Sequence, residues 1–260
     1  MAHPGHVIFI GAGPGSADLI TLRGAAALAR AEVVLHDALT DPALHELAPH
    51  AEWIDVGKRG FSTATAQTRI NALLVQHAQG GALVARLKGG DPSVFGRLEE
   101  EIHALAEAGL TFEVVPGVTA ALAAAAASAR PLTRRGNGRS VSLTTAMTQD
   151  RELHAGRRAD TEVFYMAGRQ LAMLSRRLVE SGWPVNTPVC VVSRAGWPDQ
   201  LISQHDVASL PAACVLHAGR PSVVTVGVGA TEVAPVTAAA HGGTAEDITA
   251  HRLVEGHPTD

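Results

Sequence analysis

Short apolar segments alternate with helix-length segments through the first 115 residues, and this alternation constrains the fold more than any other feature. The apolar segments predict strands at 7–10, 33–35, 53–56, 83–87 and 112–115. Helices are predicted at 18–30, at 67–79 and in the Glu- and Ala-rich segment that ends at 109. Strands separated by helices form parallel βαβ units, and ligands bind at the loops that follow the strands. An α/β domain with a mostly parallel sheet is therefore expected.

The pattern changes after Gly117, where we predict a second α/β domain with a mixed, more antiparallel sheet. Its strands are expected at 140–145, 162–166, 189–193 and 223–226, and its helices at 119–128 and 170–181. A boundary near Pro116 gives an N-terminal domain at 1–115 and a C-terminal domain at 116–232. The remainder, 233–260, has no apolar periodicity and is expected to be a disordered tail.

Charge balance and residue usage exclude several classes of protein. With 21 basic against 25 acidic side chains, the net charge of −4 provides no basic surplus for neutralising nucleic-acid phosphates. The two cysteines form neither a disulfide framework nor a metal or redox pair, which suits a reducing, cytoplasmic setting. No apolar run reaches the ~18–20 residues of a membrane helix, and the start lacks the features of a signal peptide. We expect a cytoplasmic protein with no nucleic-acid or membrane partner and no metal.

Only two of the 21 basic residues are lysines, Lys58 and Lys88, and each stands beside a glycine at the end of a predicted strand. Unlike arginine, a desolvated lysine can release its proton. Lys58 is therefore a candidate acid. Lys88 is also a candidate partner for a nearby carboxylate.

A first glycine-rich loop, Gly11-Ala12-Gly13-Pro14-Gly15, follows the first predicted strand, and Asp37 follows the second. This pattern resembles a dinucleotide-binding fingerprint, in which glycines admit a pyrophosphate and an acid binds the ribose. Ser16 stands where that fingerprint has its third glycine, and Pro14 removes a backbone N–H from the loop. An NAD-dependent oxidoreductase and a tight turn without a ligand both remain open as interpretations.

A second loop, Gly89-Gly90-Asp91-Pro92 continuing to Arg97, is more specific. Its glycines let a ligand lie against the backbone, and Asp91 offers a carboxylate to a cationic or hydroxyl-bearing group. Pro92 is expected to start a helix whose N-terminal amides face the same cavity. This segment therefore predicts a ligand site.

Together these motifs resemble the tetrapyrrole methylase family, and within it the enzymes that methylate uroporphyrinogen III. The matching stretches are 11–15, 18–22, 36–37, 57–59, 67–71, 84–97, 99–100, 114–120, 131–135 and 164–166. The resemblance implies two α/β domains with S-adenosylmethionine bound in the cleft between them, commonly in a homodimer. It implies methylation of two pyrrole carbons, from uroporphyrinogen III through precorrin-1 to precorrin-2, for sirohaem or cobalamin biosynthesis. S-adenosylhomocysteine would be the second product.

The same resemblance assigns the site residues. Asp37 would accept a proton and Lys58 would donate one, which suits a reaction in which a methylated, cationic pyrrole must lose a proton. The residues implied to contact S-adenosylmethionine are Pro14, Gly89, Gly90, Asp91, Val94, Thr119, Ala120, Met166, Ala195 and Ser222. Because arginine binds a carboxylate with two parallel hydrogen bonds, four arginines are expected to hold the carboxylate-rich substrate. They are Arg59, Arg97, Arg134 and Arg135.

Several residues depart from the family pattern. His36 replaces the usual tyrosine before Asp37, Ala146-Met147 stand where Gly-His is typical, and Arg130 replaces an apolar residue. The first two border the expected tetrapyrrole pocket, so they bear on the choice of substrate more than on the cofactor. A methylase of a later precorrin, and a descendant that binds the cofactor without turnover, remain as alternatives.

Overall fold

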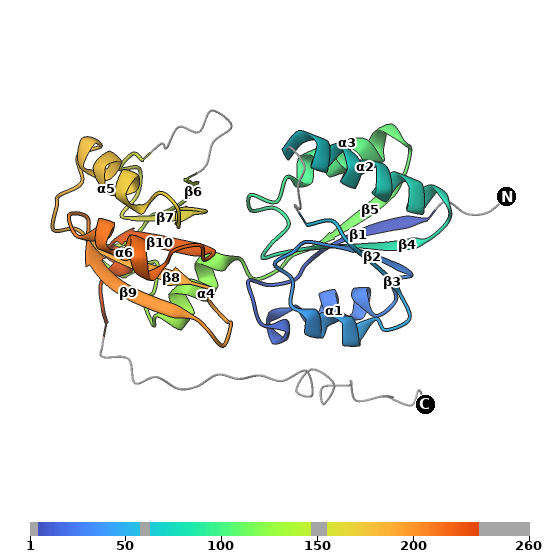
Figure 1. Ribbon diagram of the computed structural model, residues 1–260, viewed down its shortest axis with the longest axis horizontal. Helices are drawn as coiled ribbons and strands as arrows, with labels where there is room; N and C mark the ends of the chain where they lie inside the picture. Colours follow the sequence, from blue (N-terminus) through green and yellow to red (C-terminus); the bar gives the residue numbers. More distant parts are fainter. Residues whose placement is uncertain (1–4, 58–62, 147–154, 234–260) are drawn as a thin grey trace. The chain divides into compact units, whose positions relative to one another are not determined.

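The computed structural model describes residues 5–57, 63–146 and 155–233. The described chain divides into two compact units, the first ending at Val118 and the second beginning at Thr119 (Figure 1). Each unit contains a five-stranded sheet with helices packed on it. Apart from Val233, which is exposed, the tail predicted at 233–260 lies outside the described residues.

The first unit is built on a parallel sheet with the strand order β3-β2-β4-β1-β5. Its strands are β1 (His6–Gly11), β2 (Val33–His36), β3 (Glu52–Asp55), β4 (Leu83–Lys88) and β5 (Thr111–Val115). Its helices are α1 (Leu22–Leu28), α2 (Thr63–Gln79) and α3 (Leu98–Glu107). β4 lies between β2 and β1, so the chain leaves β1, forms the β2–β3 side and then returns to the middle of the sheet. The predicted parallel sheet is confirmed.

Apolar residues on both faces of β1 explain why this sheet is covered on both sides. Val7 and Phe9 belong to the core cluster that includes residues of α2 and α3, whereas Ile8 and Ile10 belong to the cluster that includes α1. Successive side chains of a strand point to opposite faces, so neighbours in the sequence join different clusters. Figure 1 shows α1 on one face of the sheet and α2 and α3 on the other.

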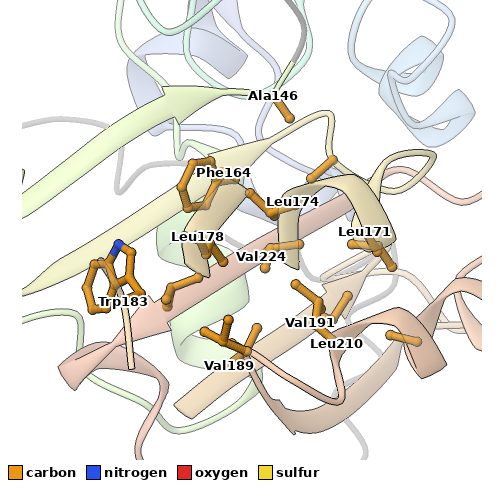
Figure 2. Close-up of a cluster of buried hydrophobic side chains, with 14 residues drawn as sticks. Ala146, Phe164, Leu171, Leu174, Leu178, Trp183, Val189, Val191, Leu210 and Val224 are labelled. Atoms are coloured by element: carbon orange, nitrogen blue, oxygen red, sulfur yellow. The ribbon is translucent and has the colours of Figure 1, made fainter. Parts of the chain in front are cut away.

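The second unit has a mixed sheet with the strand order β6-β7-β10-β8-β9. Its strands are β6 (Val141–Thr145), β7 (Thr161–Tyr165), β8 (Pro188–Ser193), β9 (Leu201–Asp206) and β10 (Ser222–Gly227). Its helices are α4 (Ala120–Ala127), α5 (Leu171–Glu180) and α6 (Ala213–Leu216). β6 and β7 pair in parallel and the other neighbours are antiparallel, which confirms the predicted mixed sheet. Leu171, Leu174 and Leu178 of α5 form a buried core with Phe164 and Val191 of the strands (Figure 2).

Several elements differ from the predicted secondary structure, among them α1 in its extent, and β9 and α6, which are not predicted. The helix predicted at 18–30 begins later, because Thr21 caps α1: its Oγ1 accepts a hydrogen bond from Gly24 N at 3.0 Å. β9 is not predicted from the sequence. It is an edge strand whose Ser, Gln, His and Asp residues interrupt the apolar pattern that identifies the other strands.

The prediction that Pro92 starts a helix is wrong. Pro92 lies in a turn, and α3 begins at Leu98. Phe95 and Arg97 both have a left-handed backbone, with φ of 54°, and such residues interrupt a right-handed helix. The backbone amides after Asp91 therefore form turns rather than the first turn of a helix.

Candidate active site

Four loops at one edge of the parallel sheet bring the predicted ligand-binding residues of the first unit together. In sheet order these loops follow β2, β4, β1 and β5. Parallel strands all end at the same edge, where α/β sheets bind ligands. The loops carry, in that order, Asp37, Gly89 to Asp91, Gly11 to Gly15, and Pro116 with Gly117.

Glycines allow three of these loops to touch through their backbones. Gly13 and Gly90 exchange two hydrogen bonds, with N···O distances of 2.7 and 3.2 Å. A Cβ atom on Gly117 would lie 2.4 Å from Gly90 O and 2.7 Å from Gly11 Cα, which leaves no room for a side chain. At Gly89, in contrast, an added Cβ would meet a single heavy atom of the described residues within 4 Å, Leu39 Cβ at 3.8 Å. The open space beside Gly89 can therefore admit a ligand.

Asp91 joins the loops that follow β4 and β5. Its two carboxylate oxygens accept hydrogen bonds from Ser93 N and Gly117 N, both at 2.8 Å. A ligand donor would therefore share an oxygen with a backbone amide. Pro14 and Val94, which are also predicted to bind the cofactor, are half-buried residues of the loops after β1 and β4.

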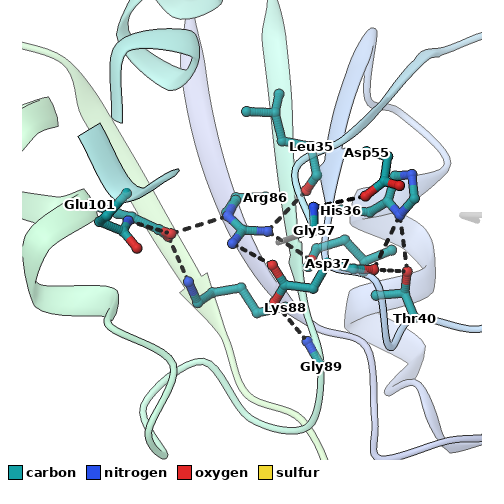
Figure 3. Close-up of polar contacts among 12 residues, drawn as sticks. Leu35, His36, Asp37, Thr40, Asp55, Gly57, Arg86, Lys88, Gly89 and Glu101 are labelled. Atoms are coloured by element: carbon teal, nitrogen blue, oxygen red, sulfur yellow. Dashed lines mark hydrogen bonds and ion pairs between the residues drawn. The ribbon is translucent and has the colours of Figure 1, made fainter. Parts of the chain in front are cut away.

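The Asp37 carboxylate, predicted to accept a proton, is held by a buried arginine of the neighbouring strand (Figure 3). Asp37 Oδ1 accepts a hydrogen bond from Arg86 Nη2 at 2.7 Å, and Asp37 Oδ2 accepts one from Gly89 N at 3.4 Å. The Asp37 side chain remains 35% exposed, whereas the Arg86 side chain is 3% exposed. The carboxylate is thus fixed from inside the sheet and remains accessible.

Arg86 belongs to a wider buried network that reaches α3 (Figure 3). Its Nε lies 3.3 Å from Glu101 Oε1, and Lys88 Nζ lies 2.8 Å from Glu101 Oε2. Gln67 Nε2 also donates to Glu101 Oε1, at 3.2 Å. The predicted role of Lys88 as the partner of a nearby carboxylate is confirmed. Two cations and two carboxylates balance one another here, and buried charges require such pairing.

These charges determine the protonation of Asp37. Burial alone would raise the pKa of Asp37, but the Arg86 guanidinium and its hydrogen bond, together with the Lys88 ammonium, lower it below the ordinary value of 3.8. Burial and the adjacent Arg86 charge lower the pKa of Lys88, against the attraction of Glu101. Asp37 is therefore ionised near neutral pH and can accept a proton.

We expect the Asp37 carboxyl to titrate below pH 3.8, and replacement of Arg86 by methionine to raise this midpoint. Because the pKa is lowered in the folded state, the ionised carboxylate stabilises the fold above its ordinary pKa, and this contribution is lost as the pH falls through the lowered value. Carbon-13 NMR titration of the Asp37 carboxyl measures both midpoints. A wild-type midpoint at or above 3.8, or an unchanged midpoint in the Arg86→Met protein, contradicts the expectation.

His36 orders the turn that follows Asp37. Thr40 Oγ1 donates its proton to Asp37 O at 2.8 Å, so this hydroxyl can only accept from the His36 ring. His36 Nδ1 lies 3.2 Å from Thr40 Oγ1 and 3.3 Å from Asp37 O, and it must carry a proton because both partners are acceptors. The His36 ring also contacts Trp53 and His45 edge-on. The imidazole therefore holds the backbone beside the predicted proton acceptor.

The predicted substrate arginines lie on both units. Arg97 makes two hydrogen bonds to the Glu100 carboxylate, at 2.6 and 2.8 Å, in a partly exposed pair of the first unit. On the second unit, Arg134 donates to a backbone carbonyl, and Arg135 is exposed. Because the Arg97–Glu100 pair is at the surface, it is weak enough for another carboxylate to compete with Glu100.

Lys58, Arg59 and Met147 lie outside the described residues. The roles of Lys58 as proton donor and of Arg59 as substrate ligand therefore stay predictions from the sequence.

The other predicted cofactor residues gather at one edge of the mixed sheet in the second unit. Met166 follows β7, Ala195 follows β8, and Ser222 begins β10, which is antiparallel to both. Thr119 and Ala120 lie at the start of α4. The Thr119 hydroxyl is hydrogen-bonded at 2.7 Å to the hydroxyl of Tyr165, which ends β7. Met166 has a left-handed backbone, with φ of 57°, and is exposed. Ala195 and Ser222 are buried.

Arg86 and Glu101 are absent from the site residues predicted from the sequence, although Arg86 holds Asp37 and Glu101 pairs with Arg86. The sequence feature that could have identified this pair is Arg86 itself, a charged residue inside the apolar segment at 83–87, because a charge in a buried strand requires a partner. The first turn of α3 contains three glutamates, and which of them is buried depends on how the helix packs on the sheet.

Across residues 5–57, 63–146 and 155–233, no group of three His, Cys, Asp or Glu side chains is arranged to hold a metal ion. Within the same residues, no helix has both the length and the apolar character required to cross a bilayer. Cys190 and Cys214 are free thiols.

Comparison with known families identifies a match over most of the chain. Residues 6–211 match the family described as Tetrapyrrole (Corrin/Porphyrin) Methylases. A Pseudomonas aeruginosa protein named uroporphyrinogen-III C-methyltransferase is 39% identical over 232 residues, which are 86% of this chain and 93% of that protein. Siroheme synthase 2 of Serratia proteamaculans is 40% identical over 230 residues, 86% of this chain and 49% of that protein. The chain thus spans about half the length of the siroheme synthases it matches.

Solved structures have the same fold. A uroporphyrin-III C-methyltransferase from Thermus thermophilus superposes with a TM-score of 0.75 at 41% identity, covering 88% of this chain and 94% of that one. A uroporphyrin-III C-methyltransferase structure from Thermus thermophilus that is complexed with S-adenosylhomocysteine has a TM-score of 0.75 at 34% identity, covering 86% of this chain and 97% of that one. A cobalt precorrin-4 methyltransferase also has a TM-score of 0.75, at 28% identity, covering 87% and 96%.

Proposed function

Because this chain belongs to the tetrapyrrole methylase family, we propose that it methylates two pyrrole carbons of uroporphyrinogen III with S-adenosylmethionine, giving precorrin-2 through precorrin-1. The observation that supports this choice of substrate is the 39% identity to a protein named uroporphyrinogen-III C-methyltransferase, over 93% of that protein's length. The product would serve sirohaem or cobalamin biosynthesis. We also propose a cytoplasmic homodimer.

The residues of the first unit fit S-adenosylmethionine. The exposed backbone of Gly89 has space for a ligand beside it, and the loops around it are held in place by the Gly13–Gly90 hydrogen bonds. We propose that the cofactor contacts Pro14, Gly89, Gly90, Asp91 and Val94 on the first unit and Thr119, Ala120, Met166, Ala195 and Ser222 on the second. When bound, S-adenosylmethionine supplies an electrophilic methyl group.

Asp37 is proposed to take the proton that the methylated ring must lose. Its low pKa makes it a weak base, but a cationic pyrrole is a strong acid, so the transfer needs no stronger acceptor. Arg86 orients the carboxylate through Oδ1 and leaves the side chain accessible. Lys58 is proposed to donate a proton to the substrate. Holding the reacting carbon close to the methyl group would provide much of the rate.

Arginines are proposed to hold the substrate carboxylates. Arg97 already binds a carboxylate, that of Glu100, with two hydrogen bonds, which demonstrates the geometry it would use for a substrate carboxylate. Arg59, Arg134 and Arg135 are proposed for the same task.

Replacing Gly89 by alanine is expected to weaken S-adenosylhomocysteine binding about tenfold and leave the melting temperature unchanged. The added methyl group enters the open space at Gly89, where no backbone atom of the described residues opposes it. Gly117→Ala is the matched control, because its methyl group meets the backbone of Gly90 and Gly11 and should destabilise the fold by about 1–3 kcal/mol. Calorimetric titration and thermal unfolding separate the two effects. Unchanged affinity in Gly89→Ala contradicts a cofactor site at this loop.

Two measurements test the function against its alternatives. Titration calorimetry should show binding of S-adenosylhomocysteine and none of NAD, and the reverse would favour an oxidoreductase. A panel of methyl acceptors should give turnover with uroporphyrinogen III. Turnover with a later precorrin instead would favour that alternative, which the similarity to a cobalt precorrin-4 methyltransferase makes worth testing.

A further inference from the structure

Five side chains form an unbroken chain of hydrogen bonds through the second unit. His205 Nε2 lies 2.8 Å from Ser203 Oγ, and Ser203 Oγ lies 2.8 Å from His217 Nε2. His217 Nδ1 lies 2.5 Å from Ser193 Oγ, which lies 2.8 Å from Ser222 Oγ. This chain of hydrogen bonds begins at half-buried residues of the edge strand β9 and ends at buried residues of β8 and β10. His217, in its middle, has no exposed surface.

The last bond of this chain determines the direction of all the others. Ser222 Oγ donates its single proton to the carbonyl oxygen of Arg220 at 2.9 Å, so it must accept from Ser193. Ser193 has then used its own proton and must accept from His217, which places a proton on His217 Nδ1. In the second unit, a buried imidazole is thus required in one defined tautomer.

The other half of the His217 ring completes the assignment. Burial, with the nearby charges of His205 and Arg220, lowers the pKa of His217 and favours the neutral ring. Neutral His217 has an unprotonated Nε2, which accepts from Ser203 Oγ, and Ser203 accepts in turn from His205 Nε2. Every hydrogen bond of the chain therefore points from His205 toward Arg220 O.

The buried end of the chain lies where predicted cofactor residues gather. Ser222 begins β10, and Arg194, directly before Ala195, donates from its backbone N to Pro221 O at 3.0 Å. A Cβ atom on Gly168 would lie 3.0 Å from Ser222 Oγ, so the loop that follows Met166 packs directly against this hydroxyl. Met166 and Arg194 both have left-handed backbones, with φ of 57° and 51°, and strain of this kind collects at ligand-binding loops.

We propose that His217 is a positioning residue for the cofactor half-site of the second unit: through Ser193 it orients Ser222 Oγ as a hydrogen-bond acceptor. This inference rests on the proposed function, because Ser222 is a proposed cofactor contact. The Ser222 proton is committed to Arg220 O, so the remaining lone pair of Ser222 Oγ can only receive a donor. The group it meets on S-adenosylmethionine is therefore an amine, an ammonium or a ribose hydroxyl.

The tautomer of His217 tests the chain in the free wild-type protein. Nitrogen-15 NMR correlation of the labelled histidine rings is expected to show neutral His217 with its proton on Nδ1, which is the less common tautomer of a free histidine side chain. A proton on Nε2 alone, or a doubly protonated ring at neutral pH, would overturn the proposed direction of the chain. This result does not depend on which reaction the protein catalyses.

Calorimetric titration with S-adenosylhomocysteine tests the positioning role. His217→Leu removes both ring nitrogens and is expected to weaken binding about tenfold, whereas His217→Asn keeps a donor near the Nδ1 position and should recover most of the affinity. Val215→Ala, an exposed residue of α6, is the control and should bind as the wild type does.

Equal affinity in the wild-type and His217→Leu proteins overturns the proposal. So does equal weakening in the Leu and Asn proteins when both unfold cooperatively, because that result indicates a packing role. If His217→Leu does not fold, the NMR result and the affinity of His217→Asn still test the positioning role of His217. Absence of binding by the wild type would instead contradict the proposed function.

Discussion

Replacing Asp37 by asparagine is expected to lower methyl transfer to uroporphyrinogen III by about 10²–10⁴-fold, the usual contribution of a positioned general base. Asparagine has nearly the same shape and keeps an oxygen for Arg86, but its amide cannot take the proton that the methylated ring must lose. The cofactor loops are held mainly by the Gly13–Gly90 and Asp91–Gly117 hydrogen bonds, and the substitution removes only the long 3.4 Å bond from Gly89 N to Asp37. S-adenosylhomocysteine binding should therefore change little.

Single-turnover rates and calorimetric titration of the same preparations measure both quantities. Glu46→Gln is the matched control, since it also neutralises an exposed carboxylate of the segment after β2 and lies outside the network around Asp37. Wild-type turnover in Asp37→Asn would exclude Asp37 as the proton acceptor. Loss of S-adenosylhomocysteine binding would assign it to the cofactor site instead.

Replacing Glu101 by leucine is expected to reduce the free energy of unfolding by about 3–5 kcal/mol, because it leaves two buried cations without their carboxylate. Arg86 and Lys88 are 3% and 2% exposed and both lie against Glu101. Lys88 can respond by losing its proton, but Arg86 cannot. Arg86 would retain only Asp37 as an anionic partner among the described residues, so the orientation of Asp37 should also change.

Urea unfolding of the variant and of Glu99→Leu measures this effect. Both glutamates lie in the first turn of α3, so both substitutions remove the same favourable interaction with the helix dipole, worth about 0.3–1 kcal/mol. Glu99 is exposed and Glu101 is fully buried, so the difference between the variants isolates the buried network. Equal loss of stability in the two proteins would show that the network contributes nothing measurable.

Much of the fold is predictable from the sequence, since burial on both faces produces continuous apolar strands. Val7 to Ile10 read as a strand because both faces of β1 are covered, and the structure confirms it. β9 is not predicted because it is an edge strand in which only two apolar residues precede the polar run 203–206. The helix predicted to start at Pro92 is wrong because proline suits a turn as well as the first turn of a helix. The left-handed backbones of Phe95 and Arg97 are incompatible with a helix there, so the segment forms a turn.

The candidate site is predictable only as far as its local motifs extend. Asp37 and the loop at Gly89 stand out because each follows a strand, and parallel strands end at one edge. The partners of Asp37 do not stand out in the same way, because Arg86 and Glu101 are 49 and 64 residues away in the sequence and meet Asp37 or each other only after the sheet and α3 have packed. The role of His217 likewise depends on contacts among α6, β8, β9 and β10.

Mass spectrometry of the tetrapyrrole products tests the central claim most directly. The protein is incubated anaerobically with uroporphyrinogen III and S-adenosylmethionine, and the products are sampled over time. We predict first a species with one added methyl group and then one with two, formed only when the protein and the methyl donor are both present. Recovery of unmethylated uroporphyrinogen III from folded protein that binds S-adenosylhomocysteine would contradict the proposed function.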